Sequence, residues 1–158
     1  MADARIFADL KNDHDRQRKL MDKVLSANKQ ERGELFEELR QELQAHAAAE
    51  EESLYATMLG KPDLREDARH SVSEHKEVDD LLGELVDLDV EDAEWEAKYG
   101  ELKHRYTHHI DEEEEEMFPA ATEGLTSAEE EELAQVFEKR KPRELARAAE
   151  ETPGDERD

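Results

Sequence analysis

The chain has 158 residues, a size typical of one domain, and a formal net charge of −24 at pH 7. So acidic a protein repels phosphates, which argues against nucleic-acid binding and against attachment to anionic membranes. The absence of cysteine excludes disulfides, thiol catalysis and cysteine-ligated zinc or iron–sulfur clusters. No apolar run reaches the roughly 18 residues of a membrane span. The first ten residues also lack the apolar core of a secretory signal, so we expect a cytoplasmic protein.

Hydrophobic periodicity predicts helices, although 43% of the residues are charged and the composition alone resembles that of a disordered chain. Apolar residues recur at steps of three and four along four long segments, and no strand-like alternation occurs. The predicted helices cover about 3–28, 31–59, 62–87 and 92–118. Gly60 indicates the end of the second helix, Pro62 suits the first turn of the third, and Pro119 closes the fourth. Because short gaps make neighbouring helices antiparallel, we predict an all-α, up-down-up-down four-helix bundle.

The C-terminal part is predicted to add a short fifth helix. Ser127 followed by Glu130 is a capping-box pattern that opens a helix over about 127–140. From Pro142 onward the chain is polar and is expected to fray. The predicted organisation is one bundle domain over residues 1–120, followed over 121–158 by a short helix and a flexible tail.

The second and fourth predicted helices share the pattern His-x-x-x-Glu-Glu-x-x-apolar-aromatic. It begins at His46 in one helix and at His109 in the other. A step of four residues places each histidine one turn from the first glutamate, Glu50 or Glu113, on one helix face. In both helices that face is the apolar stripe, where a buried imidazole and carboxylate need partners.

The first and third helices each add one histidine at an equivalent position on the stripe, His14 and His75. A single histidine on an apolar face is ordinarily a core residue, but four helices here point an imidazole inward. Four neutral nitrogens and two carboxylates suit a pair of transition metals, and iron, manganese and zinc all fit by ligand type. The predicted metal ligands are His14, His46, Glu50, His75, His109 and Glu113.

The remaining candidates lie off the stripe or have a simpler structural explanation. Three histidines are expected at the surface or just outside the site: His70, His104 and His108. The acidic run 111–116 is most simply a solvated face, with Glu113 in the ligand register. Glu112, which has a histidine four residues before it, and Glu116 are the nearest alternative ligands. Tyr106, one turn before His109, is either a core aromatic or a residue with a direct redox or ligand role.

These positions resemble the pattern His…His-x-x-x-Glu…His…His-x-x-x-Glu of the hemerythrin family, specifically its bacterial cation-binding domains. The resemblance spans roughly residues 5–120. It implies an up-down-up-down bundle with a non-haem di-iron centre, in which both glutamates bridge the irons. His14 and His46 would bind one iron, and His75 and His109 the other. It also implies an oxo- or carboxylate-bridged iron pair, for which zinc or manganese can substitute.

The sequence departs from the oxygen carriers of that family, which have an extra histidine one turn away on the third helix. Here the positions on either side of His75 are Ser71 and Asp79. The departure leaves metal positions open, which argues against reversible oxygen carriage and for binding or reducing oxygen, peroxide or nitric oxide. An oxygen or iron sensor and an iron-binding stress protein without turnover are the alternatives, so enzymatic activity stays open. We expect a monomer or weak dimer.

Overall fold

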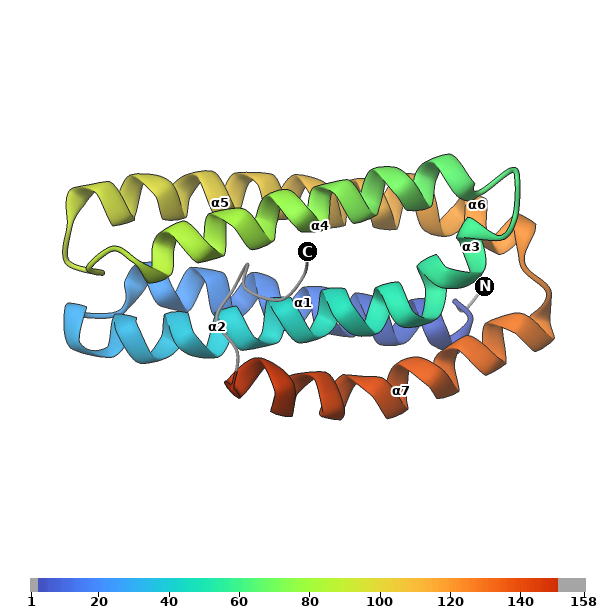
Figure 1. Cartoon of the computed structure of the whole chain (residues 1–158), viewed down its shortest axis with the longest axis horizontal. Helices are drawn as coiled ribbons and strands as arrows, with labels where there is room; N and C mark the ends of the chain where they lie inside the picture. The colour runs from blue at the N-terminus through green and yellow to red at the C-terminus, as the bar shows by residue number, and fades with distance from the viewer. Residues whose placement is uncertain (1–2, 151–158) are drawn as a thin grey trace.

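The computed structural model describes residues 3–150, and no strand occurs in that range. Helix α1 (Arg5–Ser26) pairs with α2 (Lys29–Glu50), and α4 (Arg65–Val86) pairs with α5 (Ala93–Glu112). Figure 1 shows the two pairs lying lengthwise beside each other as a helical bundle. Within the described range, no helix is both long enough and apolar enough to cross a membrane.

Two long helices of the bundle contain a π-helical turn. Helix α2 continues through η1 (Glu51–Tyr55) into α3 (Ala56–Leu59), and α5 continues through η2 (Glu113–Met117) into α6 (Phe118–Gly124). Such turns are rare and are found frequently at functional sites. Both begin within one residue of the first glutamate in the two repeated sequence patterns. The two patterns therefore share a backbone irregularity as well as their residues.

Two prolines lie in places other than those predicted. Pro62 lies in the turn before α4 and not in its first helical turn, because α4 begins at Arg65. Pro119 does not close the fourth helix, because α5 continues through η2 into α6 and Pro119 is the second residue of α6. Gly60 is the C-cap of α3, as predicted.

The apolar core is divided into two clusters, one on either side of the layer that contains the predicted ligands. On α1, Leu10 belongs to one cluster and Leu20 to the other, with His14 between them. Helices α4, α2 with its continuation into α3, and α5 with its continuation into α6 likewise have one cluster on each side of their predicted ligands. Trp95 is fully buried in the second cluster and stacks on Tyr99 with ring centroids 5.0 Å apart. The polar layer is thus enclosed by apolar packing at both ends, which limits its access to water.

The fifth helix is longer than predicted. Helix α7 (Ser127–Glu150) has 24 residues and continues through Pro142 instead of fraying there. It packs along α1 and α2 on the outside of the bundle (Figure 1). An interior proline costs about 3 kcal/mol, but burial of Leu133 and Phe137 returns roughly 1.5–3 kcal/mol each. The remainder of the predicted tail, 151–158, lies outside the described residues.

The capping box that opens α7 is one residue earlier than predicted. Thr126 Oγ1 accepts a hydrogen bond from the Glu129 N–H at 3.1 Å, and Glu129 Oε1 accepts from the Thr126 N–H at 2.9 Å. The predicted pair, Ser127 and Glu130, matches the same sequence pattern one residue later. The pattern alone does not distinguish the two registers, because each has a hydroxyl residue three positions before a glutamate.

Candidate metal centre

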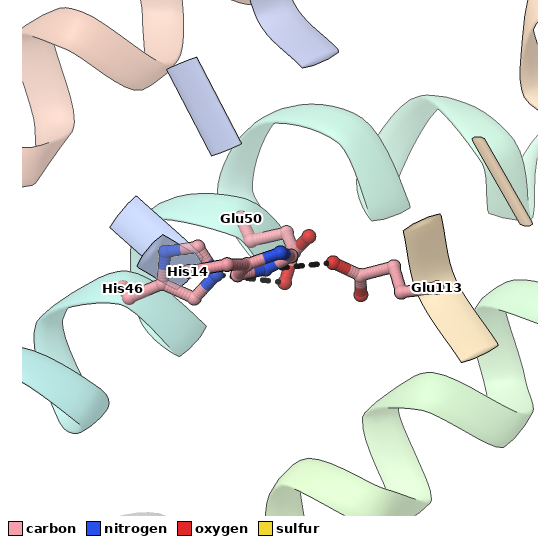
Figure 2. A group of neighbouring side chains, drawn as sticks. All are labelled: His14, His46, Glu50 and Glu113. Atoms are coloured by element: carbon pink, nitrogen blue, oxygen red, sulfur yellow. Dashed lines mark ion pairs between the residues drawn. The ribbon is translucent and has the colours of Figure 1, made fainter. Parts of the chain in front are cut away.

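All six predicted ligand side chains are buried, each no more than 6% exposed, and they meet in one layer of the bundle. Their donor atoms form two groups of four residues, with the atoms of each group within 4.8 Å of one another. The first group is His14, His46, Glu50 and Glu113, drawn in Figure 2, and the second is Glu50, His75, His109 and Glu113. Because both glutamates belong to both groups, the layer can hold two cations that share the two carboxylates.

Each imidazole points its Nε2 atom at one of the shared carboxylates. The Nε2 atoms of His46 and His75 lie 3.5 and 3.4 Å from Glu50 Oε1. The Nε2 atoms of the other two rings, His14 and His109, lie 3.2 and 3.4 Å from the Glu113 carboxylate oxygens. Two donors 2.0–2.1 Å from one metal ion are about 3.0–3.4 Å apart at ordinary coordination angles. The observed spacings therefore suit atoms that bind a common cation.

The opposite ring nitrogen of every one of these histidines has a carboxylate partner. The pairs are His14 with Glu114 at 2.6 Å, His46 with Asp13 at 2.9 Å, His75 with Glu51 at 2.7 Å and His109 with Glu74 at 2.7 Å. A carboxylate accepts the hydrogen bond that Nδ1–H donates, which leaves Nε2 as the metal-binding nitrogen and fixes the ring orientation. Metal-ligating histidines in proteins carry this kind of second hydrogen bond almost without exception.

Sequence reasoning missed these four carboxylates, although they follow a simple rule. On α1 and α4 the residue before the histidine, Asp13 or Glu74, binds the histidine of the following helix. After α2 and α5 the residue following the glutamate, Glu51 or Glu114, binds a histidine of the other helix pair. The repeated Glu-Glu step and an acidic residue directly before each single histidine were the available signal. Their targets could not be predicted, because they lie on other helices.

Buried polar atoms without a hydrogen-bond partner concentrate at this layer. They include the Nε2 atoms of His14, His46 and His75, both carboxylate oxygens of Glu50, and Glu113 Oε1. An unpaired buried polar group costs free energy, and an unpaired buried charge costs more. A cation among these atoms removes that cost, so the donor set fits a metal centre.

In the metal-free protein, protons compete with a metal for the same nitrogens. Burial lowers the pKa of His14, but the neighbouring carboxylates of Glu113 and Glu114 outweigh burial and raise the pKa to about 9. Burial likewise lowers the pKa of His75, and its carboxylate partners raise it to about 10. Burial raises the pKa of Glu50, but the charge of His46 outweighs burial and holds the pKa well below its usual range. Metal binding at these nitrogens therefore releases protons.

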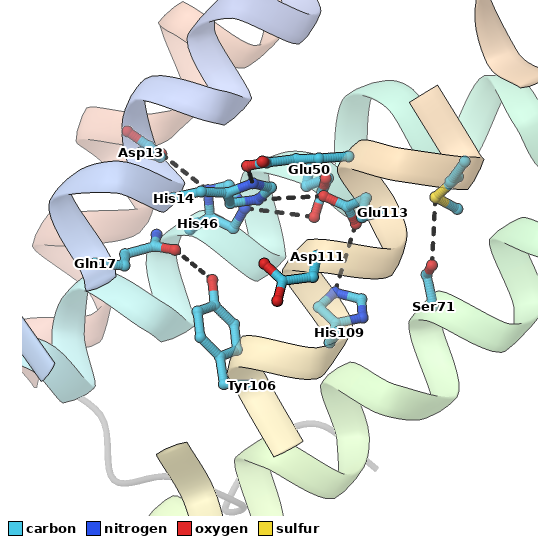
Figure 3. A network of polar contacts seen from close by, with 12 residues as sticks. Asp13, His14, Gln17, His46, Glu50, Ser71, Tyr106, His109, Asp111 and Glu113 are labelled. Atoms are coloured by element: carbon cyan, nitrogen blue, oxygen red, sulfur yellow. Dashed lines mark hydrogen bonds and ion pairs between the residues drawn. The ribbon is translucent and has the colours of Figure 1, made fainter. Parts of the chain in front are cut away.

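Tyr55, not Tyr106, is the tyrosine that contacts a predicted ligand carboxylate. The Tyr55 hydroxyl donates a hydrogen bond to Glu113 Oε2, and burial followed by the charge of Glu113 raises the pKa of Tyr55 well above its usual value. The Tyr106 hydroxyl instead donates to Gln17 Oε1 (Figure 3). Tyr106 thus packs beside His109, with ring centroids 6.1 Å apart, and directs its hydroxyl to Gln17 and not to a predicted ligand carboxylate.

The histidines expected outside the site, His70, His104 and His108, are exposed. Glu112, one of the two alternative ligands, pairs with His70 and His108 at 3.2 and 3.3 Å and belongs to neither buried group. Neither residue flanking His75 joins those groups. Ser71 donates to Met117 Sδ at 3.4 Å, and Asp79 accepts from Gln44 Nε2 at 3.0 Å.

Comparisons with known proteins agree with the resemblance seen in the sequence. The family model described as Hemerythrin HHE cation binding domain matches residues 5–121, so the chain belongs to this family. The chain is also similar to a crystal structure of a hemerythrin HHE cation binding domain-containing protein from Mycobacterium kansasii. The TM-score is 0.79 and the identity 29%, and the alignment covers 93% of this chain and 90% of the other. A search of curated proteins gives no match.

Proposed function

We propose that this chain is a non-haem di-iron protein built as an up-down-up-down four-helix bundle. Glu50 and Glu113 would bridge two irons, with His14 and His46 on one iron and His75 and His109 on the other. The observation that carries the proposal is the pair of four-residue groups that share both glutamates. Six of their inward-facing atoms lack hydrogen-bond partners, which supports a pair of cations at this layer rather than a hydrogen-bonded network.

Iron is favoured among the fitting metals by the mixture of nitrogen and carboxylate donors together with the number of ligands. Each group offers two imidazoles and two shared carboxylates, more than the three protein ligands of a typical catalytic zinc site. The shared carboxylates would hold two cations side by side and spread negative charge between them. Zinc and manganese are the substitutes that the same donors accept.

The protein's own residues hold and protect this centre. The four Nδ1 carboxylates keep the rings oriented and raise the basicity of the Nε2 atoms. Tyr55 keeps its proton and donates a hydrogen bond to Glu113 Oε2, which holds that carboxylate in place. The apolar clusters on both sides exclude water. A bound iron pair supplies electrons and open positions for a small ligand.

We propose oxygen, peroxide or nitric oxide as that ligand. Two nitrogens and two shared carboxylates would leave coordination positions free on each metal. Ser71 and Asp79, which lie one turn from His75 on α4, add no further ligand. A second candidate function, an oxygen or iron sensor, is favoured by one observation. Lys141 of α7 bonds to Asp13, the carboxylate that holds His46, so the C-terminal helix is linked to the site.

Stopped-flow mixing of the reduced, iron-loaded protein with hydrogen peroxide, and separately with oxygen, tests the reactive site. We expect rapid spectral oxidation and net peroxide consumption. Reversible oxygen uptake that vacuum releases would contradict the proposal and indicate an oxygen carrier. Absence of peroxide turnover, together with a metal-dependent change in protease cleavage of α7, would favour the sensor.

A further inference from the structure

A second cluster of metal-ligating side chains lies at the surface beside the buried centre. His70, Glu74 and Glu112 offer ligand atoms within 4.8 Å of one another. His70 Nε2 is 3.4 Å from Glu74 Oε2 and 3.2 Å from Glu112 Oε1. The His70 side chain is 57% exposed, and the two glutamates are 19% and 32% exposed. His108 adds a second imidazole 3.3 Å from Glu112 Oε2. We call these four residues the surface cluster.

A cavity of about 50 Å³ joins the surface cluster to the buried ligands. Its outer lining includes His70 and Glu112, and its inner lining includes His109 and Glu113. Room for one water takes about 10–15 Å³ by this kind of measure, so the cavity has space for a cation with part of its hydration. At its inner end are His109 and Glu113, each 2% exposed, which both belong to the second buried group of four residues. A cation that passes through the cavity would therefore reach that buried group first.

Glu74 connects the two sets of residues directly. Its Oε1 atom lies 2.7 Å from Nδ1 of the buried His109, and its Oε2 atom lies 3.4 Å from Nε2 of the exposed His70. One carboxylate thus faces both the surface cluster and the buried centre. A side chain in this position keeps negative charge along the whole path from solvent to Glu113.

We propose that the surface cluster is an entry site that captures a divalent transition-metal cation and delivers it through the cavity to the buried centre. This inference rests on the proposed two-metal function. Imidazole and carboxylate donors suit Fe²⁺, Mn²⁺ and Zn²⁺. A chain of net charge −24 also concentrates cations at its surface. Three residues of the surface cluster have ligand atoms within 4.8 Å of one another, against four in each buried group, and they are more exposed, so the surface cluster is the weaker site and transfer runs inward.

The experiment uses the full metal-free chain and Co²⁺ alone, whose binding is followed by visible absorbance in a titration and in stopped-flow mixing. His70→Ala and Glu112→Gln alter the surface cluster. His104→Ala is the matched control, since His104 is also exposed but lies outside the cluster. Circular dichroism checks that each variant is folded.

We expect the wild type to hold two tightly bound ions and a third, weaker one. Both cluster variants should lose the third ion and fill the two tight sites about tenfold more slowly, with the final count of two unchanged. The control should behave as the wild type. Two tight ions that load equally fast in wild type and His70→Ala would overturn the entry site and leave the proposed function intact. Failure of the wild type to hold two tight ions would overturn the proposed function and the transfer step with it.

Discussion

The ammonium group of Lys141 donates a hydrogen bond to Asp13 over 2.6 Å, across the interface between α7 and α1. Lys141 is only 8% exposed and also donates to Glu42 at 2.9 Å. Burial raises the pKa of Asp13, but His46 and then Lys141 outweigh burial and lower it. Helix α7 begins after residue 121, where the match to the family model ends. It nevertheless helps to orient His46, a candidate ligand, because Lys141 and His46 both bind the carboxylate of Asp13.

Replacing Lys141 should destabilise the protein more than replacing its neighbour in sequence. Lys141→Met removes the buried cation that Asp13 and Glu42 share, which should lower the free energy of unfolding by about 3 kcal/mol. Arg140→Met removes an exposed ion pair with Glu52 and should cost less than about 1 kcal/mol. Urea unfolding measures both values. Equal effects of the two substitutions would show that the buried network does not stabilise α7.

Neutralising Asp13, whose carboxylate is hydrogen-bonded to His46 Nδ1, should lower metal affinity without removing a metal ligand. Asp13→Asn keeps the size of the side chain but replaces a charged acceptor with a neutral one. Loss of such a partner typically reduces metal affinity about 10- to 100-fold. Asp15→Asn, at an exposed position paired with Arg18, is the control. Competition with a chelator of known affinity measures the change, and unaltered affinity in Asp13→Asn would contradict the assigned role of Asp13.

An added imidazole on the third long helix should slow the reaction with peroxide. Ser71 lies one turn before His75 and lines the cavity that reaches Glu113. Ser71→His therefore has partial space for its ring and could fill an open metal position. We expect two irons to be retained and peroxide consumption to slow, while Ser71→Ala reacts as the wild type. If Ser71→His holds two irons and consumes peroxide at the same rate as the wild type, an open metal position near Ser71 does not determine the reactivity.

A carboxyl pair between α1 and α7 should make stability depend on pH. Burial, followed by a hydrogen bond with Glu138, raises the pKa of Asp9 from 3.8 to about 7. Between these values the folded chain retains a proton that the unfolded chain has lost, so this contribution to stability falls as pH rises. Asp9→Asn should be more stable than the wild type at pH 8, by less than about 1 kcal/mol because the site is partly exposed. The difference should vanish near pH 4, and a pH-independent difference would contradict this assignment.

The sequence predicted the helices and the buried layer of histidines and glutamates because both follow from the 3.6-residue period. A histidine and a glutamate four residues apart fall on one face wherever the segment is helical, so His46 and Glu50 needed no tertiary information. The partners of Glu51 and Glu114 were not predictable in the same way, since each contact crosses between helices. The π turns likewise leave no signal in hydrophobic periodicity. The length of α7 was missed because Pro142 is a strong local signal that tertiary packing outweighs.

The number of irons bound per chain tests the central claim most directly. The metal-free chain is titrated anaerobically with Fe²⁺, and bound iron is measured after weakly bound ions are removed. The account predicts two tightly bound irons per chain in the wild type. It predicts fewer than two in Glu50→Ala and His109→Ala, which remove a shared carboxylate and a nitrogen donor respectively. A wild-type value of one or none, or two irons that survive the loss of Glu50, would contradict a centre in which both glutamates join two metals.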